Sequence, residues 1–325
     1  MKALWRIVGL SAVAALAACE PLDDIDLGGG GTGGGAFSKG FVFVRERDHN
    51  LFAVDDTTGN PSSPLQLTTD GKASQPAVSP TGLQVAYIST SGGVTELRVV
   101  PTTGTGSSSA VISSTSSECV GCSGFRFPTF SPSGRTLVFT LNKGGYSQLA
   151  QVAPDGTGFK IFSSPSNGAA NFYGAASFYP DGASVLAAAS NSSARDFDRL
   201  VKVSLTDGAA SVIATSLGGT AQVVVNRAVV SPDGTKVAFD GRTSNGSSIF
   251  VGNLGAGLTS VKAVTSHTGE SGGVQDTWPS WLGNTAVGFQ SDSGGNDNIY
   301  RGNIAAPGAG TFAVPGAQEP AYGGK

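Results

Sequence analysis

The sequence has few of the residue types that several specialised functions need. Its 325 residues include 3 cysteines and 2 histidines, which leaves few ligands for a structural zinc site. It has 20 Lys and Arg against 23 Asp and Glu, and this balance, without a basic stripe, argues against nucleic-acid binding. One apolar run of twelve residues, 7–18, is too short to span a bilayer. A single Met and few stretches of helix-forming residues argue against a helical protein.

The chain is instead rich in residues that make turns. It contains 48 Gly and 16 Pro, yet 39% of its residues are hydrophobic, enough to build a core. Short apolar stretches alternate with polar, Gly-rich loops. This composition predicts an all-β protein rather than a disordered one.

A short phrase, an apolar stretch followed by Ser-Pro-x-Gly, recurs along the chain at spacings of 48 to 52 residues. Repeats of this length that are rich in strands are typical of β-propellers. Its copies are Gln75–Gly82, Phe127–Gly134, Ala175–Gly182 (with Tyr179 in place of the serine), Arg227–Gly234 and, in a degenerate form, Trp278–Asn284.

Each copy of the phrase begins a unit of four strands. Proline favours the first central position of a tight turn and glycine accepts the positive φ that closes it, so the phrase joins two strands of a hairpin. A third strand, such as 249–253, and a fourth, such as 261–265, complete the unit. We therefore expect four-stranded antiparallel blades.

The two ends of the chain complement each other. Residues 41–45, 51–55 and 65–68 supply three strands of a blade and lack the first, while Glu319–Tyr322 matches a lone first strand. We therefore predict a six-bladed β-propeller whose ring is closed by the C-terminal strand, which completes the N-terminal blade.

The N-terminus resembles that of a bacterial lipoprotein. A basic start precedes the apolar run, which ends at Leu16-Ala-Ala-Cys19, a match to the lipobox. The resemblance implies cleavage before Cys19 and acyl chains, such as palmitate, on this residue; a cleaved secretory signal with a chance cysteine is the alternative. By the same resemblance, Glu20 after the cysteine favours the outer membrane.

Three regions follow from these patterns. Residues 1–18 are the expected signal peptide, and 19–40 are an acidic and Gly-rich flexible tether. Residues 41–325 form the propeller.

Cys119 and Cys122 stand in a predicted loop between two blades. Haem attachment would need a histidine after the second cysteine, where Ser123 stands, and a thioredoxin-like centre would need a βαβ unit. In an oxidising compartment we expect a disulfide that closes this loop.

The Ser-Pro-Asp-Gly phrase followed by an alternating strand resembles the PD40, or WD40-like, repeat of TolB-like six-bladed propellers. The last blade, with Trp278-Pro-Ser-Trp281, is the best match, and the resemblance covers 41–325. It implies a cell-envelope protein that binds other proteins or peptidoglycan.

We therefore expect a non-catalytic binding scaffold, held on the membrane by Cys19 and facing the periplasm or cell surface. We expect no cofactor, metal or nucleic acid. The alternative is a carbohydrate-active enzyme or a sensor of glycans or small ligands, with its site at the mouth of the channel. Since propellers bind through their loops, we predict a binding face on the loops between blades. It includes Arg126, Arg195, Asp198, Arg199, Arg227 and Asp276.

Overall fold

The computed structural model describes residues 37–56, 62–104, 106–165, 169–193, 196–267 and 273–325. Cys19 and the regions predicted as signal peptide and most of the tether lie outside the described residues. Apart from a 3-10 turn at Ser117–Cys119, the described elements are strands. No helix in these ranges is long and apolar enough to cross a bilayer.

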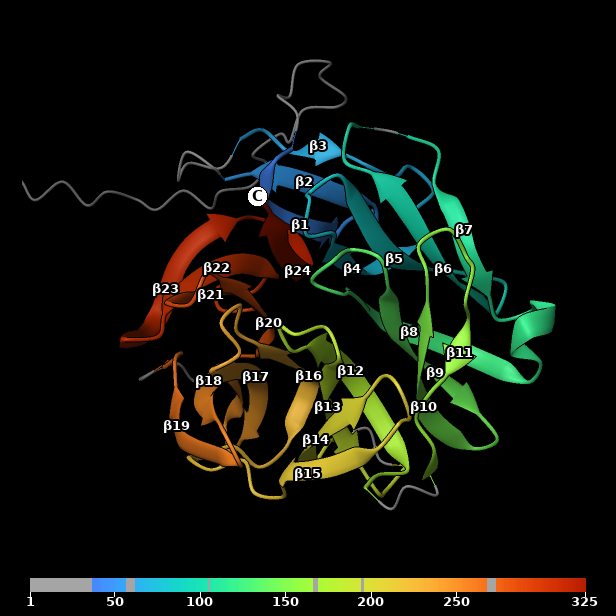
Figure 1. Cartoon of the computed structure of the whole chain (residues 1–325). Helices are drawn as coiled ribbons and strands as arrows, with labels where there is room; N and C mark the ends of the chain where they lie inside the picture. Colours follow the sequence, from blue (N-terminus) through green and yellow to red (C-terminus); the bar gives the residue numbers. More distant parts are fainter. Residues whose placement is uncertain (1–36, 57–61, 105, 166–168, 194–195, 268–272) are drawn as a thin grey trace, which may run out of the picture.

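The strands form sheets arranged around a central axis (Figure 1). Four sheets have four strands each in the described chain. The first contains β24 (Ala317–Gly324), β1 (Lys39–Arg45), β2 (Leu51–Asp55) and β3 (Leu65–Gln66). The second contains β4 (Ala73–Val78), β5 (Gln84–Ser91), β6 (Val94–Pro101) and β7 (Ser109–Ser113).

The other two four-stranded sheets come from the C-terminal half. One contains β16 (Val224–Val230), β17 (Lys236–Thr243), β18 (Gly246–Leu254) and β19 (Leu258–Ala263). The other contains β20 (Asp276–Leu282), β21 (Ala286–Ser291), β22 (Asn298–Asn303) and β23 (Ala306–Val314). All their pairings are antiparallel.

The middle of the chain forms one eight-stranded sheet, which differs from the six separate blades predicted. Its strands are β8 (Cys122–Phe130), β9 (Leu137–Lys143), β10 (Tyr146–Val152), β11 (Lys160–Ile161), β12 (Phe172–Phe178), β13 (Ser184–Ser190), β14 (Arg199–Ser204) and β15 (Ala210–Ala214). The two halves join through one parallel pair, Ser147 with Phe172. The Ser147 hydroxyl also donates to the Tyr173 carbonyl at 2.8 Å, which holds β10 against β12.

The recurring phrase forms the turn that its residues predict. In four copies the glycine has a φ between 67° and 74°. Its N–H donates to the carbonyl three residues earlier, as Gly82 does to Ser79 at 2.9 Å. The turn therefore joins the first two strands of each repeat, whose first strand faces the axis.

We call the strands nearest the axis, β4, β8, β12, β16, β20 and β24, the inner strands (Figure 1). β24 pairs with β1 and also contacts β4 and β20. The C-terminal strand thus completes the sheet of β1–β3, as the sequence of the two ends predicted.

The core lies between neighbouring sheets. The described buried side chains form six hydrophobic clusters, each shared by strands of two adjacent groups. One of them joins Phe41 and Phe43 of β1 to Ile299 of β22 and Val314 of β23. The first and last parts of the chain therefore share a core.

Candidate binding site

The inner strands share an irregularity that the sequence did not reveal. In β4, β8, β20 and β24 the residue before proline has a positive φ of 51° to 56°, which is uncommon for residues other than glycine. The ladder shifts register at the same places, so two inner residues face one on the next strand. These four positions are Gln75, Phe127, Trp278 and Glu319.

A bulge interrupts the ladder and leaves the N–H of its first residue without a strand partner. Here, side chains take that role. The Glu319 carboxylate accepts the Gln75 N–H at 2.5 Å, and the Gln75 amide oxygen accepts the Phe127 N–H at 2.7 Å. The Glu319 N–H donates to the side-chain oxygen of Gln290 at 2.9 Å. Each bulge is thus held by a side chain from another strand.

Asp240 of β17 likewise accepts N–H groups at a wider bulge in β16. Its fully buried carboxylate accepts the N–H groups of Asn226 and Arg227 at 2.9 Å each and of Trp278 at 3.0 Å. The Asn226 side chain donates a fourth hydrogen bond at 3.1 Å. Burial raises the pKa of Asp240, and these N–H donors oppose the rise.

Arg227 and Glu319 are two ionisable side chains that interact electrostatically. The Arg227 guanidinium lies 5.6 Å from the Trp278 ring centroid. Burial lowers the pKa of Arg227, while the nearby Asp240 and Glu319 favour its charged form. Burial raises the pKa of Glu319 to about 7, against the opposing effects of the Gln75 N–H and Arg227.

All six inner strands line one central cavity of about 1150 Å³. The rings of Phe127 and Trp278 meet there with centroids 5.8 Å apart, although the two residues belong to strands far apart in the chain. A second aromatic pair, Tyr146 and Phe172, has centroids 6.3 Å apart. The remaining described aromatic residues that line the cavity are Phe125, Tyr173 and Phe197.

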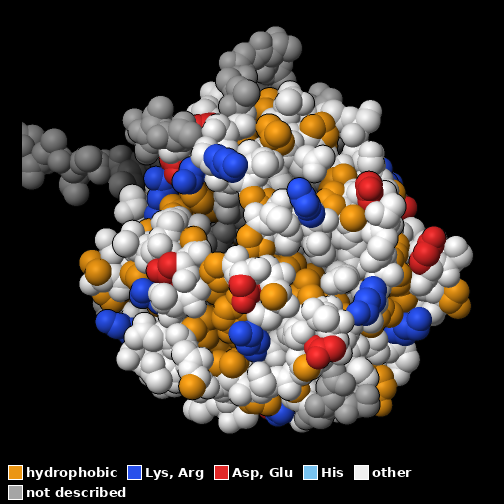
Figure 2. Space-filling view, viewed as in Figure 1, with side chains coloured by type: hydrophobic (Ala, Val, Ile, Leu, Met, Phe, Trp, Pro, Cys, Tyr) orange, Lys and Arg blue, Asp and Glu red, His pale blue; other side chains and the backbone are white. Residues whose placement is uncertain are grey.

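Polar groups line the same cavity. Gln75, Asn142 and Asn226 supply amides, and the charged lining residues in the described chain are Arg126, Lys143 and Glu319. The Arg126 guanidinium lies 5.8 Å from the Phe127 ring centroid. Figure 2 shows one face of the molecule, hollowed near the axis, with hydrophobic side chains beside the hollow and charged side chains of both signs around it.

The residues predicted for a binding face lie in different environments. Arg126 lines the cavity, and Arg227 lies against Trp278, which lines it. Asp198 and Arg199 pair with each other at 2.9 Å, outside the cavity lining. Arg195 lies outside the described residues.

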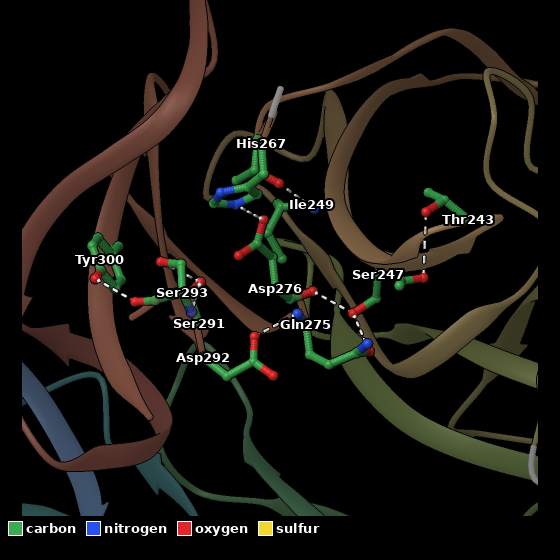
Figure 3. Close-up of polar contacts among 12 residues, drawn as sticks. Thr243, Ser247, Ile249, His267, Gln275, Asp276, Ser291, Asp292, Ser293 and Tyr300 are labelled. Atoms are coloured by element: carbon green, nitrogen blue, oxygen red, sulfur yellow. Dashed lines mark hydrogen bonds and ion pairs between the residues drawn. The ribbon is translucent and has the colours of Figure 1, made fainter. Parts of the chain in front are cut away.

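The remaining predicted residue, Asp276, is fully buried and so presents no surface to a partner. Its carboxylate is 2.8 Å from Nε2 of His267 (Figure 3). Burial raises the pKa of Asp276, and hydrogen bonds from Thr265, Ser291 and His267 oppose it. Nearby, the Asp292 carboxylate accepts the Gln275 N–H at 2.7 Å. This network ties β20 to the neighbouring loops.

Cys119 and Cys122 form a disulfide between the 3-10 turn and the start of β8. Both cysteines are buried in the cluster shared by β4–β7 and β8–β11. Within the described ranges, no group of three or more His, Cys, Asp or Glu side chains could hold a metal ion.

Sequence reasoning missed Gln75, Phe127, Trp278 and Glu319 as site residues. It used the Ser-Pro-x-Gly end of the phrase to find turns and took the residue before the first proline as ordinary strand. The available signal was that four of the copies place a large polar or aromatic residue there. The predicted loops gave Arg126 but not the strand positions that form most of the lining.

Comparisons with known proteins agree on the fold. No family model and no curated protein matches the sequence. Among solved structures, TolB from Acinetobacter baumannii superposes with a TM-score of 0.62 at 18% identity, over 90% of this chain and 68% of that one. A protein assigned as TolB from Agrobacterium tumefaciens gives 0.53 at 14% identity, over 89% and 99%. The chain therefore has a β-propeller fold like that of these TolB structures.

Proposed function

We propose that this chain is a lipid-anchored cell-envelope protein whose propeller is a non-catalytic scaffold that binds a protein or cell-wall partner at its central cavity. The observation that carries the proposal is the convergence of all six inner strands on that cavity. Binding sites favour concave surfaces with aromatic side chains and a few polar groups, and this cavity has both.

The chemistry of the lining supports binding. Glu319, the carboxylate of the lining in the described chain, accepts the main-chain N–H of Gln75, and the side chain of Gln75, one of the three lining amides, accepts the main-chain N–H of Phe127. Groups committed to fixed hydrogen bonds shape a rigid surface that loses little entropy when a partner binds. The cavity is thus preorganised for recognition.

We further propose that the fold is a six-bladed ring, with the eight-stranded sheet corresponding to two blades joined at Ser147 and Phe172. Support comes from the six clusters between adjacent strand groups and from the contacts of β24 with both β20 and β4. A closed ring would hold the cavity in one shape.

The cellular address is proposed from the sequence. The Leu16-Ala-Ala-Cys19 match suggests an acylated cysteine after a cleaved signal peptide, and the Gly-rich segment after it would let the propeller stand away from the membrane. The TolB-like fold fits an envelope protein, with the outer membrane as its proposed location.

Site-specific crosslinking in intact envelopes tests the proposal. A photoreactive residue replaces Tyr146, which is 41% exposed in the cavity lining, or Val212, which is 43% exposed on the outer strand β15. We expect a discrete adduct from position 146 and none from position 212. Equal adducts from both positions, or none from 146, would reject binding at the cavity.

A further inference from the structure

The charge of the central cavity differs in sign from that of the chain. The chain has a net charge of −3, yet the charged lining residues in the described ranges are two cations, Arg126 and Lys143, and one carboxylate, Glu319. Arg227, whose guanidinium lies 5.6 Å from the Trp278 ring centroid, adds a third positive charge, which the nearby Asp240 carboxylate offsets. A concave site with an excess of one sign of charge attracts ligands of the opposite sign, and this lining has an excess of one positive charge. The cavity therefore favours an anion.

The same surface offers flat apolar faces. Tyr146 and Phe172 form one aromatic pair and Phe127 and Trp278 another. Such faces pack against flat, C–H-rich surfaces, which include one side of a sugar ring. The volume of about 1150 Å³ exceeds the roughly 300–1,000 Å³ of pockets for single drug-sized molecules, so several rings fit.

The amides of the lining suit hydroxyl groups, which both donate and accept. The Gln75 oxygen accepts the Phe127 N–H, and so its NH₂ group is the part that can donate to a ligand. The Asn226 NH₂ donates to Asp240, and so its oxygen is the part that can accept. The cavity thus supplies both kinds of partner beside its rings.

The bulges disfavour an extended peptide as the ligand. A peptide that adds to a sheet edge needs main-chain N–H and C=O groups on that edge. The N–H groups of Gln75, Phe127, Trp278 and Glu319, which the bulges turn from the ladder, are bonded to side chains. A ligand at these positions is therefore recognised by side chains rather than by main-chain N–H groups.

We propose that the central cavity binds an acidic oligosaccharide, whose carboxylates meet Arg126 and Lys143 and whose rings pack on Tyr146, Phe172, Phe127 and Trp278. This inference rests on the proposed function, because it names the class of cell-wall or envelope partner that the cavity accepts.

Calorimetric titration of the purified protein tests the ligand class. The probes are a β-1,4-linked tetramer of mannuronic acid, the neutral mannose tetramer of the same linkage, and a tetraglutamate peptide. The acid tetramer has both carboxylates and sugar rings. The neutral tetramer has the rings without the charge, and the peptide has the charge without the rings. We expect the acid tetramer to bind at least about tenfold more tightly than either control, with affinity that falls as salt rises. Binding of a control as tightly as the acid tetramer, or no binding of the acid tetramer at millimolar concentration, would overturn the proposal.

Matched variants locate the binding. Lys143→Met and Tyr146→Ser alter the cavity lining. As controls elsewhere, Lys236→Met at the turn end of β17 removes the same charge, and Phe312→Ser on β23, 51% exposed, removes an aromatic ring. We expect each lining variant to weaken the acid tetramer by about tenfold and the controls to leave it unchanged. Equal effects of lining and control variants would contradict the assignment. A crosslink from position 146 that still forms while the acid tetramer fails to bind would reject this inference and leave the proposed function standing.

Discussion

Glu319 joins the last inner strand to the first repeat, because its carboxylate accepts the Gln75 N–H. Its pKa is raised by burial to about 7, above the ordinary 4.5. Between about pH 4.5 and pH 7, Glu319 therefore keeps its proton in the folded protein and has lost it in the unfolded chain. Folding stability contributed by this group is thus greatest below about pH 4.5 and falls as pH rises to about 7.

The variant Glu319→Gln tests this. Its amide oxygen can still accept the Gln75 N–H, but it does not titrate. We expect the free energy of unfolding of the wild type, relative to the variant, to fall between pH 5 and pH 8, measured by urea denaturation at each pH. Parallel pH profiles would show that Glu319 does not titrate in this range.

Asp240 holds a wide bulge with one carboxylate, and this predicts a large effect of Asp240→Asn. The amide keeps one acceptor oxygen and turns N–H groups toward main-chain donors, and Arg227 loses a nearby negative charge. We expect a loss of about 3–5 kcal/mol in the free energy of unfolding. As a control, Asp181→Asn keeps the oxygen that accepts the Ala183 N–H on an exposed turn, and should change stability by less than about 0.5 kcal/mol. Similar losses in both variants would contradict the role of Asp240.

The same residues show why the site was harder to predict than the fold. A residue before proline ordinarily takes extended backbone. The positive φ of Gln75, Phe127, Trp278 and Glu319 instead accompanies hydrogen bonds from their N–H groups to side chains of other strands. Those bonds join positions up to 244 residues apart. A local pattern carries no information on such partners.

At the scale of elements, the sequence predicted strands and turns well because local chemistry determines them. The Ser-Pro-x-Gly turn needs only its own residues, and alternation of apolar residues defines the strands on either side. Sheet membership was less predictable. The parallel pair of Ser147 with Phe172 depends on how closely β10 and β12 pack, and the spacing of the repeats in the sequence does not predict this.

The disulfide before β8 offers a test at this scale. It closes a loop between residues only three apart in sequence, and short loops restrict the unfolded chain little. The double variant Cys119→Ala/Cys122→Ala should lose about 2 kcal/mol in the free energy of unfolding. Urea denaturation of the variant and of the reduced wild type measures this. A loss above about 5 kcal/mol would mean that the bond holds more of the fold than its own loop.

For the whole molecule, complementarity of the two chain ends was readable because the phrase is repeated. Glu319-Pro-Ala-Tyr322 matches other first strands closely enough to identify the partner of β1. The repeat pattern did not predict the cavity, because most inner strands contribute only one or two residues to its lining. Shape at this scale arises from packing between sheets rather than from any one repeat.

Removal of residues 318–325 tests the role of β24 in the whole molecule. It deletes five of the six register pairs with β1, as well as the carboxylate on Gln75. An antiparallel ladder has on average about one main-chain hydrogen bond per residue pair, so at about 1 kcal/mol for each bond the loss is about 5 kcal/mol, or about 10 °C in Tm for a chain of this size. A synthetic peptide of residues 317–325 added to the truncated protein should restore Tm, because it can pair with β1 from solution, whereas a scrambled peptide should not. Unchanged Tm after truncation, or equal rescue by the scrambled peptide, would show that β24 does not hold the first and last sheets together.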